Sequence, residues 1–294
     1  MAELRMLPSP PPKVRCRQIL EGDLDAVAEL LCEGFPDRSR KYWTSGLARM
    51  GGRPGPAEAP RYGYVLEADG VLVGVLLLLF TGLAGDRPRF NVSSWYVRPA
   101  FRGFASLMAT LAVRRKDAVY LNTSPIAHSL PLLHAMGFRP LNRGQFLAAP
   151  LLSRTPRGAR ARAVGPQDAP HPGLDPAEFE LARAHAALGC LSLVCEAHGR
   201  ATPFVFVRRD IRYSPLGVVQ LVWKGEGADY AACAGALGRA LAARGALLAI
   251  SDANGPVPGL VGGYFPGKSP KFFKGPAEPR VNDLAFTEAV IFGP

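Results

Sequence analysis

Apolar positions along residues 14–152 change repeatedly between the period of strands and the period of helices. Those from Leu24 to Leu31 follow the i, i+3, i+4, i+7 spacing of an amphipathic helix. Asp69 and Gly70 separate two apolar runs and supply the positive φ angles of a two-residue hairpin turn. In order, the pattern predicts a strand at 14–20, helices at 24–31 and 39–50, strands at 62–68, 71–80 and 90–97, a helix after a turn at 99–103, a strand at 118–122, a helix at 128–136 and a closing strand at 146–152.

The longest apolar run, at 71–80, has ten residues. A membrane helix needs about 20, so we expect a buried strand. Residues 1–13 have no apolar signal core and predict a disordered lead-in, and we expect a cytoplasmic protein. The five cysteines are scattered, without metal-ligand spacing, so we expect free thiols and no metal site.

The second half of the chain repeats the order of the first. Three features recur at offsets of 129, 128 and 128 residues, namely 67–70 at 196–199, Trp95 at Trp223, and 118–122 at 246–250. A nearly constant offset indicates two similar domains, and a helix at 175–188 precedes the hairpin of the second. We place the first domain at 14–152, an Arg- and Pro-rich linker at 153–170 and the second domain at 171–294.

The formal net charge of +11 suits nucleic acid, anionic lipid or a polyphosphate cofactor. No aromatic residue stands between the arginines of the linker for base stacking. We therefore expect a solvated linker and no nucleic-acid partner. The oligomeric state stays open.

The stretch from Tyr96 to Thr110 predicts a strand, a turn and a helix. Pro99 ends the strand, Gly103 permits a tight bend, and apolar residues recur at helical spacing from Leu107. The free backbone N–H groups at the helix start, beside Arg102, form a candidate phosphate site. The alternative is an ordinary strand-to-helix connection with a solvated arginine.

The element order of 14–152, with V-R-P-A-F-R-G-x-A at 97–105 and A-M-G-F at 135–138, resembles the GNAT superfamily of acyl-CoA acyltransferases. The resemblance implies an α/β fold of two tandem GNAT-like domains, each a mixed, mostly antiparallel twisted sheet flanked by helices. The second domain has GEGADYAAC where the first has VRPAFRGFA, so it is degenerate and the acyl-CoA site belongs to the first. On the family pattern, the residues that would bind acetyl-CoA or a longer acyl-CoA are Trp95, Tyr96, Val97, Arg102, Gly103, Phe104, Ala105 and Ser106.

The resemblance implies transfer of an acyl group to an amine, or to a hydroxyl, of a small-molecule acceptor. The backbone of 94–97 would position the thioester, and the second domain would shape the acceptor site. Leu133 stands where many family members carry the tyrosine that protonates the leaving thiolate. The candidate catalytic residues, near the expected separation of the fourth and fifth strands, are Asn122, Ser124, His128 and His134. Ala105 and Leu107 replace family glycines, which favours the alternative of a non-catalytic ligand- or partner-binding protein.

Two loops carry further predictions. GGRPGPAEAP at 51–60 is a loop that could close over a ligand. GGYFPGKS at 262–269 matches the P-loop pattern, but Pro270 and Gly275 deny it the helix that must follow, so we reject a nucleotide site. We expect instead a surface hairpin with Phe272 and Phe273 packed inward. The alternative is that its lysines, at 268, 271 and 274, reach the cleft of the first domain.

Overall fold

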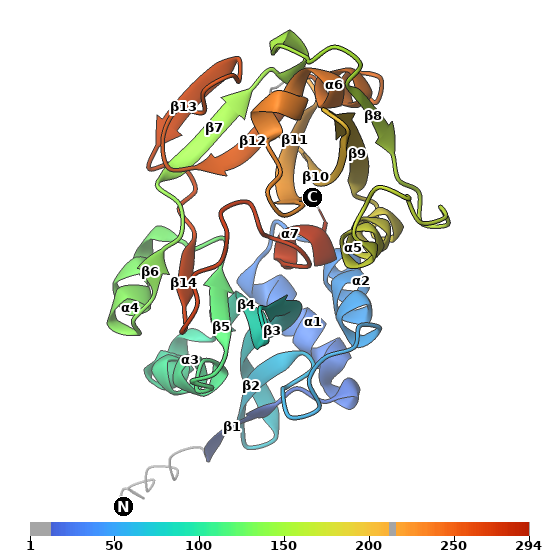
Figure 1. Cartoon of the computed structure of the whole chain (residues 1–294). Coiled ribbons are helices and arrows are strands. Elements are labelled where there is room, and N and C mark those ends of the chain that lie inside the picture. Colours follow the sequence, from blue (N-terminus) through green and yellow to red (C-terminus); the bar gives the residue numbers. More distant parts are fainter. Residues whose placement is uncertain (1–12, 212–215, 294) are drawn as a thin grey trace, which may run out of the picture.

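The computed structural model describes residues 13–211 and 216–293; residues 1–12 of the expected lead-in lie outside them. The chain forms two seven-stranded mixed sheets flanked by helices, as predicted (Figure 1). In spatial order, the first sheet contains β1 (Val14–Gln18), β2 (Gly63–Ala68), β3 (Val71–Ala84), β4 (Arg87–Val97), β5 (Val119–Asn122), β14 (Phe272–Lys274) and β6 (Arg139–Pro140). The second contains β13 (Gly262–Pro266), β7 (Gly144–Ala148), β12 (Leu248–Ala253), β11 (Val218–Lys224), β10 (Arg200–Arg209), β9 (Leu191–Ala197) and β8 (Arg160–Ala163). The α-helices are α1 (Leu24–Gly34), α2 (Arg40–Gly51), α3 (Ala105–Ala112), α4 (Leu130–Ala135), α5 (Pro176–Ala187), α6 (Tyr230–Ala242) and α7 (Glu288–Ile291).

Helices cover both faces of each sheet. In β3, Leu76 and Leu78 pack in the cluster that contains α3, whereas Leu77 and Leu79 pack in the cluster that contains α1 and α2. A strand buried on both faces is apolar at successive positions, which explains the run at 71–80. In the second sheet, α6 packs on one face and α5 on the other.

The local predictions are confirmed where the sequence carries a turn or a cap. Asp69 and Gly70 have φ angles of 48° and 85° between β2 and β3. His198 and Gly199, at the repeated position, have φ angles of 51° and 72° between β9 and β10. Asp175 caps α5 by accepting two backbone N–H bonds.

The two halves of the chain exchange one strand each. β14, from the C-terminal part of the chain, lies between β5 and β6 in the first sheet. β7, from the N-terminal half, lies between β12 and β13 in the second sheet. In Figure 1 the red β14 accordingly stands among green strands. The prediction that 146–152 closes the first domain was therefore wrong, because this strand completes the sheet of the other domain.

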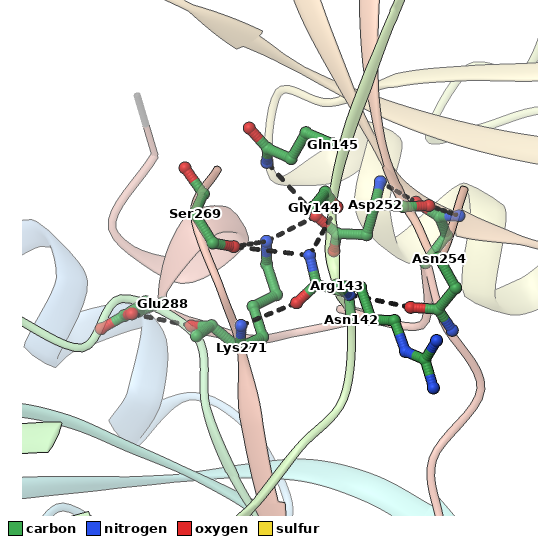
Figure 2. Close-up of polar contacts among 11 residues, drawn as sticks. Asn142, Arg143, Gly144, Gln145, Asp252, Asn254, Ser269, Lys271 and Glu288 are labelled. Atoms are coloured by element: carbon green, nitrogen blue, oxygen red, sulfur yellow. Dashed lines mark hydrogen bonds and ion pairs between the residues drawn. The ribbon is translucent and has the colours of Figure 1, made fainter. Parts of the chain in front are cut away.

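A buried polar cluster lies where the exchanged strands pass each other (Figure 2). Lys271, just before β14, forms an ion pair of 2.6 Å with Asp252 at the end of β12, and both side chains are almost fully buried. Gln145 of β7 donates to the same Asp252 oxygen. The side chain of Asn142 accepts the Lys271 N–H. Because breaking such a pair leaves an uncompensated buried charge, the cluster favours this crossing over alternative pairings.

The basic loop and the linker differ from expectation. Phe272 and Phe273 are packed inward as predicted, but as residues of a strand within the first sheet and not of a surface hairpin. Lys271 pairs with Asp252 in the interior. Arg160–Ala163 form β8, the edge strand of the second sheet, where we expected only linker. All five cysteines are free thiols, as predicted. Among the described residues, no helix is both long and apolar enough to cross a membrane.

Candidate functional site

The parallel strands β4 and β5 separate in the middle of the first sheet. β4 has eleven residues, but it pairs with β5 only from Arg89 to Asn91. Beyond Asn91, the backbone of 93–97 makes no hydrogen bond within the described chain except through its pairing with β3. The gap therefore presents free N–H and C=O groups of a central strand, which a bound extended ligand can use.

A β-bulge in β4 lies at this gap. Val75 of β3 pairs with Tyr96 and Leu77 pairs with Ser93, so β4 contains one extra residue. Ser94 has a φ of 49°, a left-handed conformation that is uncommon for a residue other than glycine. A bulge bends and twists its strand, which increases the separation from β5.

The carboxylate of Glu288 bridges the two separated strands. Its Oε1 accepts hydrogen bonds from Thr123 Oγ1 at 2.7 Å and from Ser124 Oγ at 2.5 Å, both just after β5. Its Oε2 accepts a hydrogen bond from Ser93 Oγ of β4. The Glu288 backbone N–H donates to Asn91 Oδ1, and the Asn91 amide also donates to Leu121 O of β5. Half-buried Glu288 is therefore held by side chains of both strands.

The segment that carries Glu288 comes from the second domain. Leu284 N–H donates to Val222 O of β11, and Phe286 N–H donates to His185 Nε2 of α5. His185 Nδ1 is 2.8 Å from Leu181 O, so a neutral imidazole with its proton on Nδ1 satisfies both contacts. Burial lowers the pKa of His185 to about 4. Figure 1 shows α7 between the two sheets, above β4 and β3.

The same segment fills the equivalent gap of the second domain. β11 and β12 are parallel and pair over three residues, from Val218 to Gln220, before they separate. There, Asn282 accepts the Asp252 backbone N–H and donates to the Asp252 carbonyl. Together with the hydrogen bond from Leu284 N–H to Val222 O, these contacts satisfy backbone groups of both β11 and β12 where the two strands separate. In the first domain, by contrast, α7 contacts the strands through side chains.

The predicted phosphate turn is wound as a 3₁₀ helix over Pro99–Phe104, directly followed by α3. The Ala105 N–H donates to Arg102 O, so this donor is used within the turn. Gly103 is exposed, and an added Cβ would meet nothing within 4 Å, which leaves its backbone open to a ligand. Arg102 is exposed and has no ion pair among the described residues. The turn therefore offers a free arginine and open backbone, with fewer free N–H groups than predicted.

Of the predicted cofactor residues in β4, Tyr96 has a structural partner. Its hydroxyl donates to Glu33, which also pairs with Arg98 at 2.8 Å. Arg98 and Tyr96 together hold the pKa of Glu33 below its usual range. Trp95 packs against the core cluster that contains α3, and its indole N–H is buried without a partner in the described chain. Because Glu33 pairs with Arg98, Arg102 is the arginine of the turn that has no ion pair among the described residues.

The structure separates the predicted catalytic residues. Ser124 contacts the Glu288 carboxylate, and Asn122 lies two residues before it at the end of β5. His134 is exposed on α4 and packs edge-on against Phe272 at 5.4 Å between ring centroids. The side chain of His128 is outside the described part of the structure. Their catalytic roles stay predictions.

Sequence reasoning missed Glu288 and the Asn91 and Ser93 side chains that hold it. Glu288 is 165 residues from Thr123 and stands in an unremarkable apolar helix start. No motif spacing links residues so far apart. Only the paired strands and the returning C-terminal segment bring them together.

Comparison with solved structures finds similar folds. A GCN5-related N-acetyltransferase from Anabaena variabilis matches with a TM-score of 0.59 and 9% identity, covering 89% of this chain and 72% of that chain. One from Kribbella flavida matches with a TM-score of 0.56 and 15% identity, covering 89% and 71%. The glucosamine N-acetyltransferase region of a fungal multi-domain β-N-acetylglucosaminidase matches with a TM-score of 0.56 and 11% identity, covering 90% and 38%. No protein-family model matches the chain, and no curated protein sequence matches it significantly.

These likenesses concern the fold, and they extend over both sheets because they cover about nine-tenths of the chain. The separation of the parallel strands β4 and β5 was expected from the resemblance in the first half of the sequence. The bulge in β4 and the exchange of β7 and β14 were not predicted. The chain has the GNAT fold, in two tandem copies that exchange a strand.

Proposed function

We propose that the first domain transfers an acyl group from an acyl-CoA to an amine, in preference to a hydroxyl. One observation carries the proposal. A free strand edge at 93–97 borders a carboxylate, Glu288, that three hydroxyls from β4 and β5 hold at the separation of the strands. The free edge suits an extended thioester, and the carboxylate suits a proton acceptor.

Glu288 is the proposed general base. The amine nitrogen attacks the thioester carbonyl carbon and gives its proton to a Glu288 oxygen, while the C–S bond breaks and the thiolate leaves. The hydroxyls of Ser93 and Thr123 orient the carboxylate, so that less free energy is needed to reach the reactive geometry. An N–H of the free β4 edge is the candidate donor to the developing oxyanion.

The opposite end of the acyl-CoA would lie at the turn before α3. Arg102 is the unpaired cation there, and Gly103 leaves room for a phosphate to approach the backbone. In the second domain, α6 begins with an Asp229 cap, and Asn282 bonds to the backbone at the strand gap. We therefore assign one acyl-CoA site to each chain.

Release of free thiol from acetyl-, medium- and long-chain acyl-CoAs, measured over a panel of amines, tests the proposal. We expect turnover with at least one pair, and its loss in Glu288→Gln. Glu278→Gln, on an exposed glutamate elsewhere in the C-terminal region, is the matched control and should keep full activity. Absence of both turnover and a thermal shift with every thioester would refute the proposal.

A second candidate function is a non-catalytic module that binds a ligand or partner other than acyl-CoA. Two observations favour it: the Ala105 N–H is used within the turn, and Leu107, at a family glycine position, is 48% exposed on the first turn of α3. Arg102→Ala separates the two functions. An acyltransferase should show a higher KM for acyl-CoA in this variant, whereas a module that binds some other partner should bind it unchanged.

A further inference from the structure

A cavity of about 200 Å³ lies between the end of α2, the following loop, β3 and α7. Its walls include Pro56 and Pro60 of the loop, Phe80 of β3 and Ile291 of α7. The loop is the GGRPGPAEAP stretch that the sequence marks as able to close over a ligand. The cavity is separate from the β4 edge, since no residue of β4 lines it.

Arg53 supplies a charge to this cavity and lacks a counter-ion. Its guanidinium lies over the ring of Phe286, with Cζ 3.5 Å from the ring centroid. Among residues 13–211 and 216–293 it has no ion pair and no side-chain hydrogen bond. Burial lowers its pKa to about 10, the direction expected when no carboxylate compensates a partly desolvated cation. A partly buried charge without a counter-ion is unfavourable, and an anionic ligand would compensate it.

Helix α7 connects the cavity to Glu288. Ile291, the last residue of α7, lines the cavity, and Glu288 is the first. At about 1.5 Å per residue, the two lie roughly 4.5 Å apart along the axis, and residues three apart share a face of the helix. Arg49 of α2 holds the end of α7 by donating to Ile291 O at 2.9 Å. The cavity wall at Ile291 is therefore about one helical turn from the residue that carries the proposed base.

We propose that this cavity is the acceptor subsite and that it selects small amines that also carry a carboxylate, with Arg53 as the partner of that carboxylate. The inference rests on the proposed acyl transfer, because it places the amine of the same molecule toward Glu288. The cavity has room for a molecule of amino-acid size, and the apolar walls of Phe80 and Ile291 contact its carbon atoms.

Binding is measured first, without acyl-CoA. Glycine and β-alanine are titrated against glycinamide by calorimetry or ligand-observed NMR, using the full chain. We expect the two carboxylates to bind more tightly than the amide, and Arg53→Met to weaken their binding by about ten- to a hundredfold. Arg53→Lys, which keeps the charge but loses the planar geometry, should show a smaller loss. Arg87→Met, on an exposed arginine outside the cavity, should bind as the native chain does.

Folding of the variants is checked by thermal unfolding. Arg53→Met loses only the contact with the Phe286 ring, so its unfolding temperature should stay within a few degrees of that of the native chain. Equal binding of glycine and glycinamide by the native chain, or unchanged glycine binding by Arg53→Met, would overturn the inference.

Turnover then separates this inference from the proposed function. With active enzyme, Arg53→Met should raise the KM for carboxylate-bearing amines and leave the KM for acyl-CoA unchanged. Turnover of carboxylate-bearing amines that is indifferent to Arg53→Met would leave the acyltransferase standing and remove the carboxylate subsite. Arg53-dependent binding without any thiol release would leave the anion site standing and remove the acyltransferase.

Discussion

The two domains open their central sheets at the same point and then use the gap differently. In each, a parallel pair of strands is joined over three residues before it separates. In the second domain, Asn282 and Leu284 bond to the freed backbone, so the gap is occupied by the chain itself. In the first, Glu288 contacts side chains from both strands and leaves the backbone of β4 free.

The difference shows that the GNAT fold does not by itself make a cofactor site. The separation of the strands is a property of the sheet, present in both copies. Whether a ligand can use it depends on what covers the strand edges and on the turn that follows. In this chain, the segment at 280–292 closes the gap of the second domain and places a carboxylate at the gap of the first. Four substitutions test what these features contribute.

The largest effect, on kcat, should come from removing the carboxylate of Glu288. We expect Glu288→Gln to lower kcat by roughly 100- to 10,000-fold, since general-base catalysis contributes on that scale. Asn282→Ala, at the corresponding gap of the second domain, should lower stability and leave kcat of the folded fraction unchanged. Equal losses of kcat in both variants would mean that the segment acts only as structural support.

The next change tests the ion pair at the crossing of the exchanged strands. Lys271→Met should lower the free energy of unfolding by about 3–5 kcal/mol, because it leaves the Asp252 carboxylate buried without its partner. Urea denaturation measures the loss. Lys268→Met, at an exposed position of the same loop, should change stability by less than about 0.5 kcal/mol. A similar urea midpoint for Lys271→Met and Lys268→Met would show that the exchanged strands do not need the ion pair between Lys271 and Asp252.

The third prediction concerns pH and the contact between α5 and the segment at 280–292. His185 accepts the Phe286 N–H at Nε2, so a proton on that atom would replace the acceptor by a donor. Its folded pKa of about 4 lies below the 6.5 of an ordinary histidine, because burial disfavours the charged imidazolium. The folded state therefore binds fewer protons, and this contribution is complete above about pH 6.5 and is lost as the pH falls toward 4. The loss should reach about 3 kcal/mol, since one pKa unit corresponds to about 1.4 kcal/mol.

Denaturation at pH 7.5 and at pH 4.5 measures this loss. Replacement of His185 by Gln should flatten the difference between the two pH values, and His134→Gln, on an exposed histidine, should keep it. An unchanged pH dependence in His185→Gln would assign the effect to other groups. Arg53, Asp283 and Arg89 are the charged residues that act on His185.

The smallest effect should come from the turn before α3. Leu107→Ala removes exposed apolar bulk from the first turn of the helix without the flexibility of glycine. We expect a fall of roughly two- to fivefold in the KM for acyl-CoA, below about 1 kcal/mol, with unchanged stability. A rise in KM would mean that Leu107 contacts the cofactor.

Much of the fold followed from local pattern. The hairpin turns at 69–70 and 198–199, the cap at Asp175 and the buried strand β3 all depend on residues close in sequence. The exchange of β7 and β14 could not be predicted in this way. The alternation of apolar residues indicates that a strand has a buried face, but it does not indicate which sheet the strand joins. The strand β8 was missed because Arg160–Ala163 is an edge strand with mostly exposed side chains.

The roles of the predicted site residues stay predictions. Ser124 and the strand at 94–97 lie at the gap between β4 and β5, whereas His134 packs against Phe272. The proposed base, Glu288, and the anion partner, Arg53, carry no motif. Their proposed roles depend on neighbours more than 150 residues away in the sequence, Thr123 for Glu288 and Phe286 for Arg53.

Most helices and strands, the repeat and the basic turn could be predicted from the sequence, because these depend on short-range spacing, turn residues and hydrophobic periodicity. The tertiary structure decided which sheet each strand completes and where the C-terminal segment returns. Those choices depend on burying Lys271 with Asp252 and on satisfying the freed backbone of β11 and β12, contacts that form only when distant parts of the chain meet.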